Sequence, residues 1–277
     1  MSQPSPAREG ARVLVSVLVI AITVLPLAWM VSLSFKGGDD INNAKFLPSA
    51  WSWDNYRTVF KNDLFTDALR NSIGISLIAT VIAVACATGT AYAIVRMEFP
   101  GKRLILLGAL AIAMFPTIAV VGPLFDMWRS IGLFDTWIGL ILPYLSFTMP
   151  LSIWTLTSFF KQIPWALEDA ARIDGASAWQ AFRYVIAPMA VPAVVTTAIL
   201  VFFFAWNDFV FSVSLTSTNK SRTVPAALAF FTGASQFQQP TAAVAAASVV
   251  VSIPVVVLVL IFQKRIVAGI TSGAVKE

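Results

Sequence analysis

The stretch NSIGISLIATVIAVACATGTAYAIV, residues 71–95, decides the fold class, because its 25 residues carry no charge between Arg70 and Arg96. A helix of about 20 apolar residues is long enough to cross the hydrocarbon core of a bilayer. The run therefore predicts a membrane-spanning helix.

Five further intervals of the chain are equally free of charge. We expect six transmembrane helices in an all-α membrane protein, at about residues 13–35, 71–95, 104–123, 137–160, 190–214 and 242–263. The first interval follows Arg8 and Arg12, which resemble the basic N-terminal region of a signal peptide. Its apolar run is too long for a signal peptide, however, and no A-x-A cleavage site follows it. We expect it to be retained, so that residues 1–277 form one transmembrane domain.

The composition excludes several other classes of protein. Hydrophobic residues make up 58% of the chain and charged residues only 12%, against about 45–50% and about 25% in soluble domains. There is no histidine and one cysteine, Cys86. Histidine-based catalytic triads, HExxH zinc sites, intrachain disulfides and iron–sulfur clusters are therefore excluded. We expect no metal and no cofactor to be bound by this chain.

The basic residues predict the orientation in the membrane. If both termini are cytoplasmic, 11 of the 19 Lys and Arg residues lie inside, and so does the whole net charge of +5. The short second loop carries Arg96, Lys102 and Arg103 together. Cytoplasmic loops are enriched in such residues, so we expect a multi-pass protein with both ends in the cytoplasm.

The outer segment from Lys36 to Asp67 carries several aromatic residues. Trp53, Tyr56 and Phe60 have the spacing of one helical face, and Ser52 is placed to cap such a helix. Two interpretations stay open for this face: an aromatic belt at the membrane surface, or a platform for an external partner.

The inner segment, about residues 161–188, predicts a helix–turn–helix between the fourth and fifth spans. Pro164 suits a first helical turn, and Gly175 accepts the left-handed conformation that ends a helix. Ser177 followed by Gln180 is a capping box, which starts a second short helix. Pro188 marks the return of the chain to the membrane.

The surface of this inner segment is too apolar for a solvated linker. Its large apolar residues are Trp165, Leu167, Ile173, Trp179 and Phe182, and small residues surround its turn. Such a surface suits insertion into a groove of a second protein. It also suits packing against the inner ends of the chain's own spans, and both interpretations stay open.

The same segment resembles the EAA loop of ABC-importer permease subunits. That loop reads E-A-A, three residues, G, nine residues, I-x-L-P. Here Asp169 stands at the glutamate position, Ala170, Ala171, Gly175 and Pro188 match, and Val185 and Ala187 replace the isoleucine and leucine. The wider phrase LEDAARIDGA, residues 167–176, is more specific than the bare pattern.

The resemblance extends over nearly the whole chain and points to the carbohydrate branch of the family, of the MalG type in the maltose and trehalose class. Importers of trehalose of the mycobacterial kind are the nearest resemblance. The matching motifs are Ser34-Phe35-Lys36, Asn55-Tyr56, Asn71-Ser72, Ala91-Tyr92-Ala93, Met114-Phe115-Pro116, Ile131-Gly132-Leu133, Ala205-Trp206-Asn207-Asp208-Phe209, Gln263-Lys264-Arg265 and Gly273-Ala274-Val275-Lys276.

This resemblance implies a bacterial inner-membrane assembly that imports a sugar, such as a disaccharide. Its other members would be a second six-span permease, two ATPase subunits that hold ATP and Mg²⁺, and an extracytoplasmic sugar-binding protein; no nucleic acid is implied. The implied ATPase-coupling residues are Glu168, Asp169, Ala170, Ala171, Asp174, Gly175 and Ala176. A further implied ATPase contact lies at the C-terminus, at Gly273, Val275 and Lys276.

The chain itself is not expected to be an enzyme. The phosphate-binding pattern G-x-x-x-x-G-K-[ST] is absent: Gly101-Lys102 is its nearest fragment, and Arg96 stands where the first glycine should be. Nucleotide is therefore expected to be handled by another polypeptide.

Polar residues inside the fifth span are candidates for a translocation pathway or gate. Asn207 and Asp208 interrupt an apolar run, and Trp206 beside them offers a ring on which a sugar could stack. Polar groups within a membrane span normally face the interior of the helical bundle or a water-filled cavity. Anchoring at the membrane surface, or a hydrogen bond to a neighbouring span, is the alternative.

Three other functions fit the sequence less well than a sugar permease. An ion-coupled secondary transporter usually needs ionisable groups at mid-membrane, whereas Asp208 is alone and is expected off-centre, in the outer half of its span. An intramembrane hydrolase lacks a histidine to activate its nucleophile. An ABC permease for a non-sugar solute would keep the EAA-type loop, and only the carbohydrate-type motifs argue against it.

Overall fold

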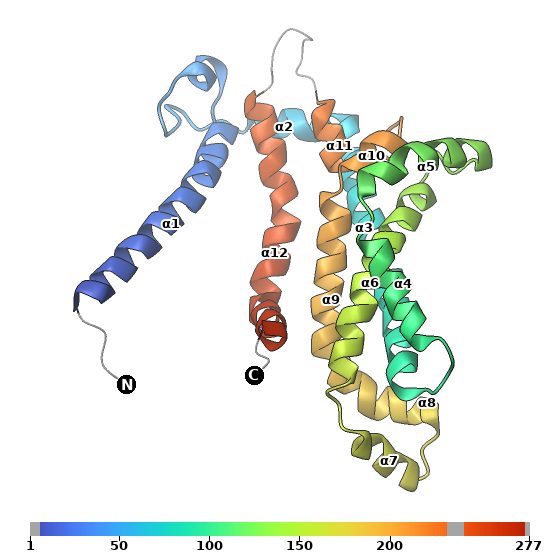
Figure 1. The fold of residues 1–277 in the computed structure, drawn as a ribbon. Helices are drawn as coiled ribbons and strands as arrows, with labels where there is room; N and C mark the ends of the chain where they lie inside the picture. The colour runs from blue at the N-terminus through green and yellow to red at the C-terminus, as the bar shows by residue number, and fades with distance from the viewer. Residues whose placement is uncertain (1–5, 232–240, 275–277) are drawn as a thin grey trace. The chain divides into compact units, whose positions relative to one another are not determined.

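The computed structural model describes residues 6–231 and 241–274, and every regular element in those ranges is a helix (Figure 1). Among the described residues, five helices are long and apolar enough to cross a membrane, by length and composition. A sharply bent pair of shorter helices makes a sixth if the pair counts as one span. The expected all-α membrane fold is confirmed at this level.

The chain divides into two compact units, Met1–Thr66 with Phe230–Ile253, and Asp67–Ala229 with Pro254–Glu277. Two long helices, α3 (Asp63–Arg96) and α12 (Thr241–Ala274), contribute residues to both units.

The first unit begins with α1 (Pro6–Ser34), followed by the 3-10 turn η1 (Gly38–Asn42) and by α2 (Asp54–Lys61). Every large aliphatic side chain of α1 from Val13 to Leu27 is more than half exposed. Such a continuous apolar surface is stable only against lipid or a partner protein, so α1 has the surface of a membrane span.

Lys36 is fully buried just after α1. Its Nζ donates to the backbone oxygens of Asn43 at 3.1 Å and Lys45 at 2.6 Å, and to Oδ1 of Asn43 at 3.1 Å. The ammonium also lies 4.8 Å from the ring centre of Trp29. A buried cation is tolerated when its donors are satisfied in this way, so Lys36 organises the loop that follows α1.

Two motifs singled out in the sequence meet in this unit. Asn55 Nδ2 donates to the carbonyl oxygens of Ser34 at 2.9 Å and Lys36 at 2.7 Å, and the hydroxyl groups of Tyr56 and Ser34 lie 2.8 Å apart. The Ser34-Phe35-Lys36 and Asn55-Tyr56 motifs therefore join α2 to the end of α1.

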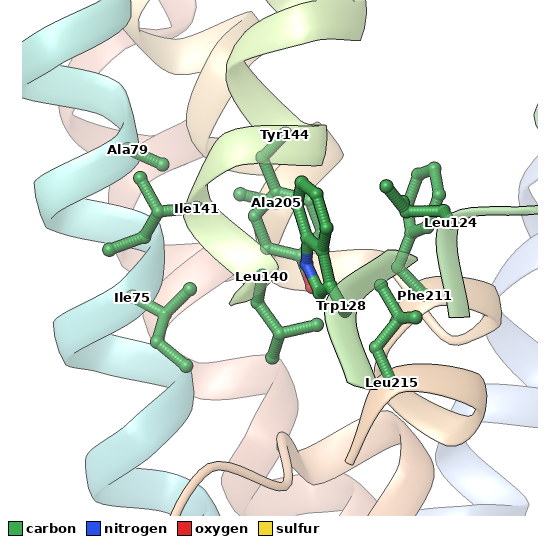
Figure 2. Packing of buried hydrophobic residues seen from close by; sticks show 10 residues of the cluster. All are labelled: Ile75, Ala79, Leu124, Trp128, Leu140, Ile141, Tyr144, Ala205, Phe211 and Leu215. Carbon is green, nitrogen blue, oxygen red and sulfur yellow. The ribbon is translucent and has the colours of Figure 1, made fainter. Parts of the chain in front are cut away.

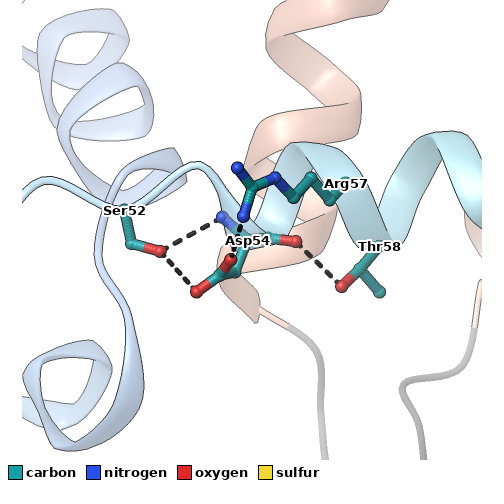
Figure 3. Close-up of polar contacts among 4 residues, drawn as sticks. All are labelled: Ser52, Asp54, Arg57 and Thr58. Carbon is teal, nitrogen blue, oxygen red and sulfur yellow. Dashed lines mark hydrogen bonds and ion pairs between the residues drawn. The ribbon is translucent and has the colours of Figure 1, made fainter.

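The start of α2 differs slightly from the expected cap. Trp53 occupies the position before the helix and makes no side-chain cap. The Ser52 hydroxyl accepts from the Asp54 N–H at 3.1 Å and donates to Oδ2 of Asp54 at 2.9 Å, and Arg57 pairs with Asp54 at 3.3 Å (Figure 3). Ser52 therefore contacts the first turn of α2 from the position before the N-cap residue Trp53, and not from the N-cap position itself.

The second unit contains most of the helical bundle. After α3 its elements are α4 (Lys102–Ala113), α5 (Thr117–Ile131), α6 (Trp137–Phe160), α7 (Trp165–Ile173), α8 (Ala178–Ala181), the π-helical turn η2 (Phe182–Ile186), α9 (Ala187–Asn207), α10 (Val210–Leu215) and α11 (Val224–Ala229). In Figure 1, α7 and α8 lie at one end of this unit, and α5, α10 and α11 lie at the other.

The core of this unit forms where α3, α6 and α9 pack together. Ala79, Ala83, Ala87 and Ala91 are fully buried and recur every four residues along α3, so small side chains on one face let neighbouring helices approach closely. Figure 2 shows the cluster near α10, where Ile75 and Ala79 of α3 lie with residues of α5, α6, α9 and α10.

Asp135 joins two loops of the second unit. Its carboxylate accepts from the N–H groups of Ser217 at 3.0 Å and Thr218 at 3.2 Å, and from the hydroxyls of Thr218 at 2.6 Å and Ser221 at 2.7 Å. Burial is the largest influence and would raise the pKa of Asp135. The hydrogen bonds from Ser221, Thr218 and Ser217 together outweigh it and lower the pKa to about 2.

The expected third span, 104–123, is not one continuous helix. Helix α4 ends at Ala113, α5 begins at Thr117, and the two axes meet at 92°. Pro116 has an extended conformation, with φ −66° and ψ 119°. Proline lacks an N–H donor and disfavours helix in the residue before it, so Met114-Phe115-Pro116 breaks the helix.

The expected fifth span, 190–214, also differs. The helix starts earlier, since α8, η2 and α9 run on without a break from Ala178, and it ends at Asn207 rather than residue 214. Asp208 adopts an extended backbone with ψ 125°, and α10 is a separate short helix. Elsewhere α1, α3 and α12 contain the expected spans almost whole, and α6 has the expected bounds of 137–160.

Candidate functional site

The helix–turn–helix predicted for residues 161–188 is present as α7, a turn, and α8. Gly175 has φ +85°, the left-handed conformation expected of a glycine at the end of a helix. Its N–H donates to the Arg172 oxygen at 3.0 Å, and the Ala176 N–H donates to the Ala171 oxygen at 2.9 Å. Ser177 and Gln180 form the expected capping box, which starts α8.

The outward face of this element carries most of the large apolar residues noted in the sequence. Ile173 is 86% exposed, Trp179 65% and Trp165 50%. The expected coupling residues Asp169, Ala170, Asp174 and Gly175 are exposed as well, and Ala171 and Ala176 are half-buried. Within residues 6–231 and 241–274, no helix therefore covers the tip of the helix–turn–helix.

Glu168 differs from its neighbours, because it faces inward and is 1% exposed. Its Oε2 lies 3.4 Å from Nε of Arg96 at the end of α3, and its Oε1 lies 2.9 Å from Nη2 of Arg172. The Tyr92 hydroxyl donates to Oε1 at 3.3 Å. Glu168 therefore ties α7 to α3, and the side chain of the adjacent Asp169 points to the outside.

The residues around this ion pair continue the connection into the bundle. Arg96 Nη2 donates to the Ile163 oxygen at 2.9 Å, and its guanidinium lies 4.3 Å from the ring centre of Trp165. The ring of Tyr92 packs against Phe182 of η2 with centroids 4.7 Å apart. Side-chain contacts therefore connect α7 to both α3 and η2. We call the residues Tyr92, Arg96, Glu168 and Arg172 the inner ion cluster.

Asp208 occupies the break between α9 and α10. It accepts from the N–H groups of Phe211 at 3.3 Å and Ser212 at 3.0 Å, so it caps the start of α10. The Tyr144 hydroxyl of α6 donates to its Oδ2 at 2.9 Å. This is the hydrogen bond to a neighbouring span that the sequence left as an alternative.

The other two pathway candidates lie apart from that contact. Trp206 is 2% exposed and stacks on Phe202 at 5.4 Å, so its ring is not free to receive a sugar within this conformation. Asn207 is exposed, and its Nδ2 donates to the Phe203 oxygen at 2.8 Å. The three adjacent residues therefore point to three different environments.

A hollow that the sequence did not predict lies between α6 and α9. It has a volume of about 160 Å³, and its polar lining includes Thr148, Ser152, Thr155 and Thr197. The hydroxyls of Thr148 and Ser152 donate to the backbone one turn earlier, at 2.7 and 2.8 Å. The clustering of Ser and Thr along 148–155 was the available signal, but such residues usually bond to their own helix.

Some of the expected site residues cannot be placed. Val275 and Lys276 lie outside the described residues. Gly273 lies in the last turn of α12.

Comparison with known proteins gives consistent results. Residues 79–271 match the family model described as "Binding-protein-dependent transport system inner membrane component". The chain is 57% identical to the trehalose transport system permease protein SugB of Mycobacterium tuberculosis, over 94% of each chain. It is 38% identical to the trehalose/maltose transport system permease protein MalG of Thermococcus litoralis, again over 94% of each.

A solved structure has the same fold. A chain of a bacterial ABC transporter involved in the import of the acidic polysaccharide alginate superimposes with a TM-score of 0.81, covering 95% of this chain and 99% of that one. Sequence identity is 22%, so this comparison supports the fold alone.

Proposed function

Because the chain belongs to the family of binding-protein-dependent transport system inner membrane components, we propose that it is a permease subunit of an ATP-driven sugar importer. The observation that carries the proposal is the 57% identity to a trehalose permease over 94% of both chains. A disaccharide of the trehalose or maltose class is the substrate, in line with the two relatives named for those sugars.

In this proposal the chain forms half of the translocation pathway. A second six-span permease supplies the other half, two ATPase subunits bind ATP and Mg²⁺ in the cytoplasm, and an extracytoplasmic protein delivers the sugar. The chain binds no nucleotide or metal of its own. Its six spans form one permease domain in the bacterial inner membrane, with α4 and α5 together as the third span and both termini in the cytoplasm.

The helix–turn–helix of α7 and α8 is the coupling element between ATP hydrolysis and the spans. Its exposed tip, with Asp169, Ala170 and Gly175, is available to enter a groove of an ATPase subunit. The buried Glu168 binds to Arg96 at the end of α3. Closure of the ATPase dimer would displace α7, and the inner ion cluster and η2 would transmit that displacement to α3 and α9. Gly273, Val275 and Lys276 add a second contact to the ATPase.

The break at Asp208 is the candidate gate. Asp208 both caps α10 and accepts from Tyr144 of α6, so a change in the distance between α6 and α9 would alter the start of α10.

We expect Asp208→Asn to change sugar uptake or basal ATPase activity. Tyr144→Phe removes the contact to α6 and keeps the cap, and it should shift activity in the same direction. Wild-type behaviour of both variants would leave the contact with a structural role only. Trp206 and Asn207 accompany this gate as flanking candidates.

The complete assembly provides the decisive experiment. The tagged chain is extracted in mild detergent, its co-purifying proteins are identified, and ATPase activity is measured with the binding protein and trehalose, maltose or diacetylchitobiose. We expect a second permease and an ATPase to be recovered, with stimulation greatest for trehalose or maltose. A chain that purifies alone and transports solute in liposomes without ATP would contradict the proposal and favour a secondary transporter. Stimulation by a non-sugar solute alone would contradict the substrate class.

A further inference from the structure

We propose that a basic pocket where α3 ends, α4 begins and α6 leads into α7 binds the headgroup of an anionic phospholipid. The pocket has a volume of about 280 Å³, and Lys102, Arg103 and Lys161 line it together with Trp165 and Leu106. These side chains come from parts of the chain that are up to 63 residues apart, between Lys102 and Trp165, so the fold assembles the pocket.

The charges of the pocket are only partly balanced within the described chain. Lys102 pairs with Glu98 at 3.0 Å. The described residues place no carboxylate within ion-pair distance of Arg103 or Lys161. The nearby Arg96 is already paired with Glu168, and its guanidinium lies over the indole ring of Trp165. Two positive side chains therefore remain to attract an anion, and phosphate is an anion that both Lys and Arg bind well.

The walls of the pocket favour a lipid over a soluble phosphate ester. Ile94, Val95 and Leu106 supply apolar surface beside the three cations. On α4 the neighbouring Leu104 is 73% exposed and Leu107 is 63% exposed, as expected for a helix in contact with acyl chains. Arg96 ends α3, Lys102 begins α4 and Lys161 follows α6, and basic residues at the ends of spans are typical of a cytoplasmic membrane surface. Basic pockets between transmembrane helices bind anionic lipid headgroups in this way.

The inference is independent of the solute that the protein carries, and its test needs no transport. The delipidated complex in detergent is titrated with dioctanoyl phosphatidylglycerol or dioctanoyl phosphatidylcholine, and bound lipid is counted by native mass spectrometry. We expect saturable binding of phosphatidylglycerol at least tenfold tighter than of phosphatidylcholine. Each juxtamembrane cation is worth about fivefold in affinity, so Arg103→Gln with Lys161→Gln should weaken binding roughly 25-fold.

A matched pair of substitutions controls for general charge. Lys45→Gln with Lys220→Gln removes two positive charges from exposed side chains outside the pocket, and binding should stay within twofold of the wild type. Equal binding of the two lipids by the wild-type complex would overturn the proposal without any variant. Equal loss in both double variants would overturn it too, as would displacement of the lipid by inorganic phosphate at comparable concentration, which would assign the pocket to a soluble ligand.

Discussion

The carboxylate of Glu168 joins parts of the chain that are far apart in sequence. It binds Arg96 at the end of α3 and Arg172 within α7, and it accepts from Tyr92. With the carboxylate removed, the buried Arg96 would keep its charge without a counterion. Burying an unpaired charge costs more than an intact ion pair gains, so the pair matters most when one partner is lost.

We therefore predict that Glu168→Gln lowers the free energy of unfolding by about 3 kcal/mol, measured by thermal unfolding of the purified complex. Asp169→Asn is the matched control, since it makes the same chemical change on the next, exposed residue. Asp169→Asn should leave stability unchanged and weaken the response of ATPase activity to sugar. Equal stability of both variants would show that the inner ion cluster contributes nothing to folding.

Asp135 predicts a pH dependence at the residue scale. Its pKa is lowered from 3.8 to about 2, so its stabilising effect is complete above pH 3.8 and is lost as the pH falls towards 2. With allowance for solvent screening, the effect is worth about 1 kcal/mol. Asp135→Asn should destabilise the protein at pH 7, and the difference from the wild type should shrink below pH 3.8 and disappear as the pH falls through about 2.

Asparagine is the informative replacement at this position. Asp135 has φ +58°, and asparagine is among the few residues that adopt this conformation readily. The variant therefore removes the charge and adds little backbone strain. A difference from the wild type that stays constant between pH 7 and pH 2.5 would exclude the carboxylate as its source.

At the scale of elements, the turn between α7 and α8 depends on Gly175. A Cβ atom added there would meet no other atom of the described chain within 4 Å, so the cost of a substitution comes from φ +85° alone. For most residues this conformation costs about 1–2 kcal/mol, and asparagine tolerates it better.

We predict that Gly175→Val leaves membrane insertion intact and separates ATP hydrolysis from sugar transport, because the turn would change shape. Gly175→Asn should retain most of the coupling. Both are measured as sugar taken up per ATP hydrolysed in proteoliposomes. Unchanged transport in Gly175→Val would exclude α7 and α8 as the coupling element, and equal loss in both variants would indicate a clash with a partner rather than backbone strain.

The elements also show which features the sequence could and could not predict. The glycine stop and the capping box of α7 and α8 were predicted because both depend on residues within one turn. The bend at Pro116 was missed, because the length of an uncharged interval gives no information about the direction of the helix axis. The Glu168–Arg96 pair spans 72 residues, and no local pattern indicates that this carboxylate turns inward.

The motifs that carry the family resemblance were likewise easier to find than to interpret. Asn71 and Ser72 of α3 bind the loop before α11. Asn71 Nδ2 donates to the backbone oxygens of Asn219 at 2.8 Å and Arg222 at 3.0 Å, and Ser72 Oγ accepts from the Val224 N–H at 2.8 Å. Their partners lie about 150 residues away, so only the fold gives these motifs a physical role.

For the whole molecule, orientation depends on whether α4 and α5 cross the membrane together. Helix α4 has 12 residues, or about 18 Å at the usual rise, which is short of a hydrocarbon core of about 30 Å. If the pair counts as one crossing, α2 and the loop before α7 lie on opposite sides of the membrane.

Single cysteines test this orientation. In a Cys86→Ser background, Lys61→Cys should react with a membrane-impermeant maleimide in intact cells, and Gln162→Cys only in inverted vesicles. Both positions are exposed, so accessibility within the chain is matched. Labelling of both from the same side would mean that the bent pair does not cross, and it would reverse the proposed location of α7.

The π-helical turn η2 sets the rotational phase between the coupling element and the span that follows it. Ala181, Ile186 and Ala190 are all fully buried, although the first two are five residues apart, a spacing that an α-helix would place on different faces. The wider turn absorbs one additional residue. Deleting a single residue from Phe182–Ile186 would restore regular α-helical winding and rotate α7 and α8 by about 100° about the axis of α9. Trp179 and the tip of the turn would then face a different direction.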